Sequence, residues 1–248
     1  MSDDPAEASF LSTKDISPNE RLIFALDVPG TEEAKRLVEH LGDSVTFYKI
    51  GLELFMSGGY FELMEWLVER EKKVFADLKF FDVPQTVRSA VRALSRTGAT
   101  FATVHGNDSI LRAAAEDKGD LKILAVTVLT SLDQGDMEDL GFQANIRDVV
   151  LSRARRALEV GCDGVISSGI EVPYLREALG PRLVVVTPGI RPVKNTDDQK
   201  RTVDVEEAFR NGADYIVVGR PIKEPKDFDS PRAAAESIQA RIARLFAG

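Results

Sequence analysis

Short apolar runs alternate with longer amphipathic segments along the chain from about residue 21 onwards. The runs are rich in Val, Ile, Leu and Phe and have the length of buried strands, whereas the segments between them carry apolar residues at helical spacing. This alternation predicts eight strands, at residues 21–27, 45–51, 73–79, 101–105, 122–129, 164–168, 183–188 and 215–219.

The segment TEEAKRLVEHLG, residues 31–42, is typical of the stretches between the strands. It predicts a helix that Thr31 caps, with acidic residues in its first turn, where they favour the helix dipole, and with Gly42 at its end. Further amphipathic helices are predicted at residues 86–98, 205–213 and 231–246.

A strand followed by a helix, repeated eight times, predicts an α/β protein with a single (β/α)8 TIM barrel. The alternative is a doubly wound open sheet, but the glycine-rich G-x-G-x-x-G turn of that class does not follow the first strand. We expect one barrel domain over residues 21–248 and a polar arm, mobile or loosely docked, over residues 1–20. The polar segment 190–202 is long enough to form a lid.

Composition limits the kinds of partner. The formal net charge is −8 and the pI about 5.0, which disfavours a nucleic acid or an anionic membrane, because both need a basic face. No apolar run is long enough to span a membrane, and the first residues lack the apolar stretch of a secretory signal. The single cysteine, Cys162, allows no intrachain disulfide, which suits a cytoplasmic protein, and it is expected to be a small buried side chain.

Charged residues stand where three consecutive predicted strands end: Asp27 on the first, Lys49 on the second, and Asp77 with Lys79 on the third. In a (β/α)8 barrel the carboxyl ends of the strands form the functional face. Because side chains alternate along a strand, Asp77 and Lys79 should both face the barrel mouth. Such a cluster is either an active site or a structural network of ion pairs, and its place on adjacent strand ends favours the active site.

A second feature follows the last two predicted strands. TPGIRP comes after the seventh and VVGRPI covers the end of the eighth, and each combines a glycine with an arginine, Arg191 or Arg220. A glycine such as Gly219 lets a ligand approach the main chain, and arginine can bind a phosphate with two hydrogen bonds. A phosphate site is therefore expected here, where many barrels have one.

Together these motifs resemble those of the orotidine 5′-monophosphate decarboxylase family. DLKFFD matches the family's D-x-K-x-x-D signature, and FALDVP, FYKIGLELF, AVTVLTS, TPGIRP…DDQKR and ADYIVVGRPI follow the family's order. The similarity extends from about residue 21 to residue 222. It implies decarboxylation of orotidine 5′-monophosphate to UMP and CO2 without a cofactor or metal, the last step of de novo pyrimidine nucleotide synthesis.

The resemblance also implies a role for each matching residue. Lys79 gives the proton to C6 as CO2 leaves, Asp77 lies against the substrate carboxylate, and Lys49 orders Asp77. Asp82 completes the catalytic group from the neighbouring subunit and Thr86 reaches there too, so a homodimer with shared sites is expected. The other residues are expected to bind the ribose (Asp27, with Lys49), the pyrimidine edge (Thr130) and the phosphate with its surroundings (Pro188, Arg191, Gln199, Gly219 and Arg220).

Two other functions stay open. One is a Mg2+-dependent 3-keto-gulonate-6-phosphate decarboxylase or hexulose-phosphate synthase. These relatives have an acid where this chain has Lys49, which would repel a divalent cation. The other is a catalytically silent phosphate-binding barrel, which would not need the paired acids and lysines. His105 is expected to be a hydrogen-bonded supporting residue rather than a base.

Overall fold

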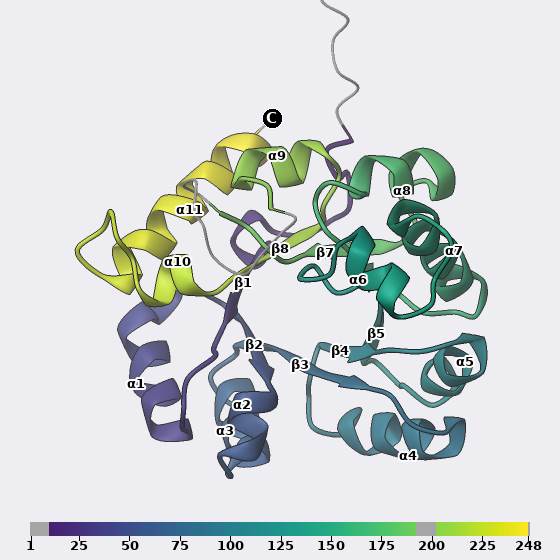
Figure 1. Cartoon of the computed structure of the whole chain (residues 1–248). Coiled ribbons are helices and arrows are strands. Elements are labelled where there is room, and N and C mark those ends of the chain that lie inside the picture. The colour runs from purple at the N-terminus through teal and green to yellow at the C-terminus, as the bar shows by residue number, and fades with distance from the viewer. Residues whose placement is uncertain (1–9, 192–201, 248) are drawn as a thin grey trace, which may run out of the picture.

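The computed structural model describes residues 10–191 and 202–247. Its strands are parallel and form a closed barrel, in which each pairs with the next and the last pairs with the first (Figure 1). The predicted (β/α)8 barrel is therefore confirmed, and the open sheet is excluded. The strands are β1 (Leu22–Ala25), β2 (Phe47–Gly51), β3 (Lys73–Phe80), β4 (Phe101–Val104), β5 (Lys122–Val126), β6 (Gly164–Ile166), β7 (Val184–Thr187) and β8 (Tyr215–Val218).

Helices surround the barrel, and short additional helices follow β2, β5 and β8 before the longer helix of the repeat (Figure 1). Within the described ranges, none of the helices combines the length and the apolar character that crossing a bilayer requires. The α-helices are α1 (Thr31–Leu41), α2 (Leu52–Met56), α3 (Tyr60–Val68), α4 (Pro84–Leu94), α5 (Asp108–Glu116), α6 (Gln134–Asp139), α7 (Ile146–Glu159), α8 (Val172–Leu179), α9 (Val205–Arg210), α10 (Arg220–Lys223) and α11 (Pro231–Phe246); the 3-10 helices are η1 (Pro18–Glu20) and η2 (Gly42–Ser44).

The start of α1 differs from the prediction by one residue. Gly30, in extended conformation, is the N-cap and makes no side-chain cap bond, while Thr31 is already the first helical residue. The preference of threonine for the N-cap position does not decide where this helix starts. Its buried residues Ala34, Val38 and Leu41 pack against the barrel, and such packing contributes more to helix stability than a cap does. The predicted end is confirmed, since Gly42 has a φ of 55° and donates its N–H to Val38 O.

The core has two layers, as in other closed barrels. The larger layer lies between the outward-facing strand residues and the helices. The smaller one fills the barrel itself and contains a cluster of aromatic rings, in which Phe101 contacts Phe47, Phe75 and Tyr215 at centroid distances of 5.1, 6.0 and 5.2 Å. These buried rings fill the barrel below the carboxyl ends of the strands.

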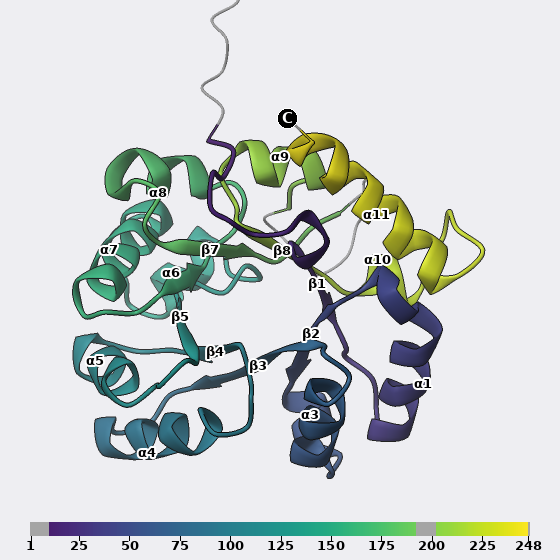
Figure 2. The same cartoon turned by 180° about the vertical axis from the view of Figure 1, so that it is seen from behind.

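The described part of the N-terminal segment, residues 10–20, packs against the barrel end opposite the mouth (Figure 2). Asp214 is fully buried there and accepts hydrogen bonds from Lys14 Nζ at 2.9 Å and from Arg176 Nη2 at 2.8 Å. Phe10 N donates to Arg210 O at 2.9 Å. The segment thus contributes an ion pair with a buried carboxylate of the barrel, and the domain boundary at residue 20 stays a prediction.

Gly164 gives a test of how tightly β6 fits its neighbours. A Cβ at this position would lie 2.2 Å from Val184 O and 2.9 Å from Leu124 Cδ2. We predict that Gly164→Ala lowers the free energy of unfolding by about 1–3 kcal/mol, as overpacking of a closed core does. Urea unfolding followed by circular dichroism measures the change.

The matched control is Gly135→Ala in the exposed helix α6, where the nearest atom, Asp133 Oδ1, would lie 3.4 Å from the new Cβ. This variant should be as stable as wild type or slightly more stable, because alanine favours helix. Equal stability of the two variants would contradict the tight fit of β6.

Candidate active site

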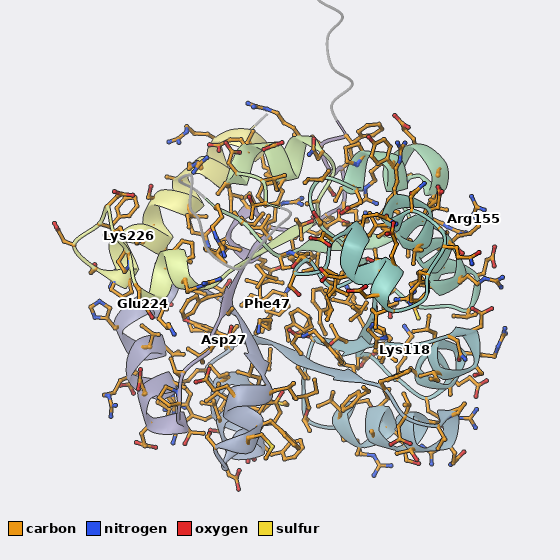
Figure 3. All side chains as sticks on the ribbon, in the orientation of Figure 1. Asp27, Phe47, Lys118, Arg155, Glu224 and Lys226 are labelled. Atoms are coloured by element: carbon orange, nitrogen blue, oxygen red, sulfur yellow. The ribbon has the colours of Figure 1, made fainter. Side chains whose placement is uncertain are left out.

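A cavity of about 310 Å³ opens at the barrel mouth, between the carboxyl ends of the strands. Asp27 and Phe47 lie toward the middle of the ring of elements, whereas Arg155 and Lys226 lie at its outer edge (Figure 3). Apolar side chains form the cavity floor, and charged or polar groups form its walls. The floor comprises Ala25, Phe75, Val126, Ile166 and Val217; the walls comprise Asp27, Lys49, Asp77, Lys79, Thr130, Ser131, Arg191, Arg220 and Lys223.

The four charged residues of the first three strand ends meet in one chain of contacts. Lys49 Nζ lies 3.1 Å from Asp27 Oδ1 and 3.5 Å from Asp77 Oδ2. Lys79 Nζ lies 2.9 Å from Asp77 Oδ1. The carboxylate of Asp77 therefore stands between two ammonium groups, and only 12% of its side chain is exposed.

Burial and charge act in opposite directions on this cluster. Burial by itself would lower the pKa of Lys49, but the carboxylates of Asp77 and Asp27 outweigh it and hold that pKa above its ordinary value. Burial would likewise raise the pKa of Asp77, but Lys49 and Lys79 hold it below the ordinary value. Both residues are therefore charged at neutral pH.

A register shift between β3 and β4 occurs just where β3 carries Lys79 at the barrel mouth. Between the pairs Ala76–Ala102 and Phe80–Val104, strand β3 advances four residues while β4 advances two. Two extra residues leave the alternation of faces unchanged, so Asp77 and Lys79 share the inner face as expected. The extra length also puts Lys79 into the left-handed region, with a φ of 48°.

Thr103 and Lys223 are among the residues at the site that were not identified from the sequence. Thr103, on β4, donates its hydroxyl to Asp77 Oδ1 at 2.8 Å and accepts the N–H of Lys79 at 2.9 Å. Lys223 lines the cavity and donates to Asp27 O at 2.9 Å. Thr103 could have been found from the sequence, because it is a polar residue on the inner face of the fourth predicted strand. Lys223 could not, because it contacts a main-chain oxygen, which no sequence pattern reveals.

The cavity wall also contains residues that were expected to bind phosphate. Pro188, Arg191, Gly219 and Arg220 all line it, from the segments that follow β7 and β8. Gly219 is the N-cap of α10 and comes close to β1, since a Cβ there would lie 3.4 Å from Ala25 Cβ. Thr130 lines the cavity beside Ser131.

Gln199 and the expected lid lie outside the described residues, except for the two ends of the lid segment. Asp82 and Thr86 are described, but they do not line the cavity of their own chain. Both are exposed, and Asp82 Oδ1 accepts the N–H of Val83 at 2.6 Å at the start of α4.

His105 follows β4 and packs its ring against Phe81, with centroids 5.4 Å apart. Its Nδ1 has no hydrogen-bond partner among the described residues, so the expected hydrogen-bonded role is not seen at that atom. Burial, with Arg153 and Lys79 nearby, lowers the pKa of His105. Cys162 is buried as expected, and burial raises the pKa of its thiol to about 12, so it stays protonated and unreactive at neutral pH.

The fold and the site together define a (β/α)8-barrel enzyme whose cavity is lined by a charged Asp–Lys cluster and by two arginines, Arg191 and Arg220. Comparison with known proteins identifies the family. Residues 20–238 match the model of the orotidine 5′-phosphate decarboxylase / HUMPS family, and the chain belongs to this family.

Curated relatives and a solved structure agree with this assignment. The orotidine 5′-phosphate decarboxylase of Methylococcus capsulatus is 65% identical over 241 residues, which cover 96% of this chain and 98% of the relative. That of Xanthomonas euvesicatoria is 51% identical over 230 residues, 92% of this chain and 93% of the relative. The crystal structure of the Lactobacillus acidophilus decarboxylase superposes with a TM-score of 0.80 at 34% identity, covering 90% of this chain and 99% of that one.

The charge cluster predicts how stability depends on pH. Because the pKa of Asp77 is lowered in the folded protein, its ion pairs stabilise the fold above its ordinary pKa of 3.8, and this stability is lost as pH falls further. We predict that Asp77→Asn lowers the free energy of unfolding at pH 7 by about 1.5–3 kcal/mol, the range for hydrogen bonds to a charged group. The difference from wild type should shrink below pH 3.8.

Urea unfolding at a series of pH values measures this difference. Asp229→Asn, the same change at an exposed position of the α10–α11 loop, is the matched control and should follow wild type throughout. A wild-type advantage over Asp77→Asn that stays constant down to pH 2–3, about one unit or more below the ordinary pKa of Asp, would contradict the ion-pair account.

Proposed function

We propose that the chain decarboxylates orotidine 5′-monophosphate to UMP and CO2, the last step of de novo pyrimidine nucleotide synthesis. The observation that carries the proposal is the Asp27–Lys49–Asp77–Lys79 cluster in a cavity that Arg191 and Arg220 also line. Membership of the family and 65% identity to a decarboxylase of this name support it.

The residues that line the cavity suit a nucleoside monophosphate bound in one orientation. Its phosphate would lie against Arg220, Arg191 and the N–H groups around Gly219, since guanidinium groups bind phosphate oxygens in pairs. The ribose hydroxyls would then meet Asp27 and Lys49, and Thr130 would lie at the edge of the pyrimidine. This direction brings C6 and its carboxylate to Asp77 and Lys79, above the apolar floor.

The reaction needs one bond to break and one to form. The bond between C6 and the carboxylate carbon breaks, CO2 leaves, and the electron pair stays on C6. Lys79 Nζ supplies a proton to that pair as a new C–H bond forms, and solvent later returns a proton to the amine. The positive charge of Lys79 stabilises the developing carbanion, which is catalysis by preorganised charge.

Asp77 adds a second electrostatic effect. Its ionised carboxylate would face the substrate carboxylate, which loses its charge as CO2 forms. At about 4 Å and an effective dielectric constant near 20, two such charges repel by about 4 kcal/mol. We propose that this repulsion is relieved in the transition state and so accelerates the reaction.

The metal-dependent alternative fits the cluster poorly. Lys49 Nζ occupies the place between the carboxylates of Asp27 and Asp77, where a divalent cation would have to bind. Two positive charges there would repel each other, and a lysine offers no lone pair while it is protonated. We therefore propose a reaction without metal or cofactor.

The deciding experiment follows the ultraviolet absorbance of orotidine 5′-monophosphate with the purified protein in EDTA. We predict rapid loss of the orotate band with wild type and a rate at least about 1,000-fold lower with Lys79→Ala, because general acid and charge stabilisation are lost together. Orotidine, which lacks the phosphate, should react far more slowly than the nucleotide.

Activity that appears only when Mg2+ is restored would favour the metal-dependent relatives. Tight binding of the nucleotide with no turnover would favour the silent barrel. Lys122→Ala, an exposed lysine at the start of β5, is the matched control and should retain wild-type activity.

We further propose that two chains form a homodimer in which Asp82 and Thr86 of each reach the site of the other. Thr86 lies in the first turn of α4 and Asp82 just before that helix, and both are outside the cavity of their own chain. Two apolar side chains flank Asp82 and are widely exposed in the single chain, Phe81 at 68% and Val83 at 63%. A second copy would cover them while it receives Asp82.

Mixed dimers test this sharing. We predict that Asp82→Asn and Lys79→Ala are each severely impaired, whereas their co-expressed mixture regains roughly a quarter of wild-type activity, because half the dimers would then hold one intact site. Turnover assays of the mixture, with sedimentation to measure assembly, give the answer. Full activity of Asp82→Asn as a monomer would refute the shared site.

The location of the protein stays a proposal. A cytoplasmic enzyme is supported by the place of the reaction in nucleotide synthesis and by the single buried cysteine.

A further inference from the structure

We propose that Thr103 is a positioning residue for this reaction: its hydroxyl holds the Asp77 carboxylate and the Lys79 main chain in the arrangement that the proton transfer needs. The inference rests on the proposed decarboxylation, in which Asp77 faces the substrate carboxylate and Lys79 supplies the proton. Thr103 itself touches neither the cavity nor any atom that reacts.

The hydroxyl of Thr103 makes two hydrogen bonds of opposite direction. It donates to Asp77 Oδ1 at 2.8 Å and accepts from Lys79 N at 2.9 Å. The side chain has no exposed surface, so water does not compete for either bond. One atom therefore fixes the distance between the carboxylate of Asp77 and the main chain of Lys79.

The N–H of Lys79 needs this acceptor because of the irregularity in β3. The ladder between β3 and β4 is interrupted from Ala76 to Phe80, and Lys79 lies inside the interruption. Its φ of 48° is unfavourable for a residue that carries a Cβ, and only Glu71 shares this feature among the non-glycine residues described. Such a conformation persists where the surroundings enforce it, and Thr103 provides a specific bond that does so.

The reaction gives a reason why Asp77 needs a hydrogen-bond partner that carries no charge. Asp77 is otherwise held by Lys79 Nζ on the same oxygen and by Lys49 Nζ on the other. When Lys79 gives its proton to C6 it becomes a neutral amine, and its attraction for Asp77 falls. The hydrogen bond from Thr103 does not depend on that charge, so it keeps Asp77 in place through the step.

Three variants separate the hydroxyl from the volume of the side chain. Thr103→Val has nearly the same shape but removes the hydroxyl, and Thr103→Ser keeps the hydroxyl but removes the methyl group. Thr187→Val is the matched control, because it removes a hydroxyl in the same way at another fully buried position, on β7. There the hydroxyl has no hydrogen-bond partner among the described residues.

We expect kcat of Thr103→Val to fall roughly 10- to 100-fold, the range for one hydrogen bond to a charged group. Thr103→Ser should recover most of this loss, and Thr187→Val should keep the wild-type rate. Binding of UMP should change less than about twofold in all three, because the product lacks the carboxylate that Asp77 opposes and has already received its proton.

Wild-type kcat in Thr103→Val, or a loss that Thr103→Ser does not recover, would overturn the proposal. An equal loss of UMP affinity and of kcat would do the same, because it would indicate general damage to the site. If Thr103→Val does not fold, Thr103→Cys replaces it, since a thiol is a much weaker hydrogen-bond partner.

Failure of the proposed function would look different. Wild type would then leave orotidine 5′-monophosphate unchanged, and the rates of the variants would carry no information. Crystal structures of wild type and Thr103→Val test the hydroxyl independently. Displacement of Lys79 Nζ from Asp77 in the variant would support the positioning role, and an unchanged distance would refute it.

Discussion

The placement of one carboxylate between two ammonium groups is the constraint on which the mouth of this barrel depends. Asp77 is nearly buried, and a charge so placed is costly unless it is paired. Lys49 and Lys79 provide the pairs, and they in turn are held by Asp77 and, for Lys49, by Asp27. Removing any one of them would leave an uncompensated charge, so the cluster is a unit rather than a set of separate contacts.

The barrel makes this unit possible by bringing three consecutive strand ends together. The closed sheet supplies a rigid base, and the aromatic cluster beneath keeps water from entering below. The contacts with a ligand fall to long side chains at the mouth, among them Arg191 after β7 and Arg220 after β8. In the proposed binding mode, binding energy gained at the phosphate would be used at the reacting carbon.

Much of this arrangement could be predicted from the sequence. Strand positions followed from apolar runs, and the meeting of Asp27, Lys49, Asp77 and Lys79 followed from the rule that parallel strand ends share one face. The irregularity of β3 could not be predicted, because local propensity disfavours a left-handed lysine and only the pairing with β4 enforces it. Thr103 was missed for that reason, since its two hydrogen bonds exist only where the ladder is interrupted.

The N-terminal segment has a practical consequence. Residues 10–20 pack against the barrel end opposite the mouth, where Lys14 pairs with the buried Asp214 (Figure 2). A chemical linkage made through this segment would hold the protein on a solid support with its mouth turned toward the solution. Substrate could then diffuse to the immobilised enzyme without obstruction from the matrix, provided that the linkage leaves the ion pair of Lys14 intact.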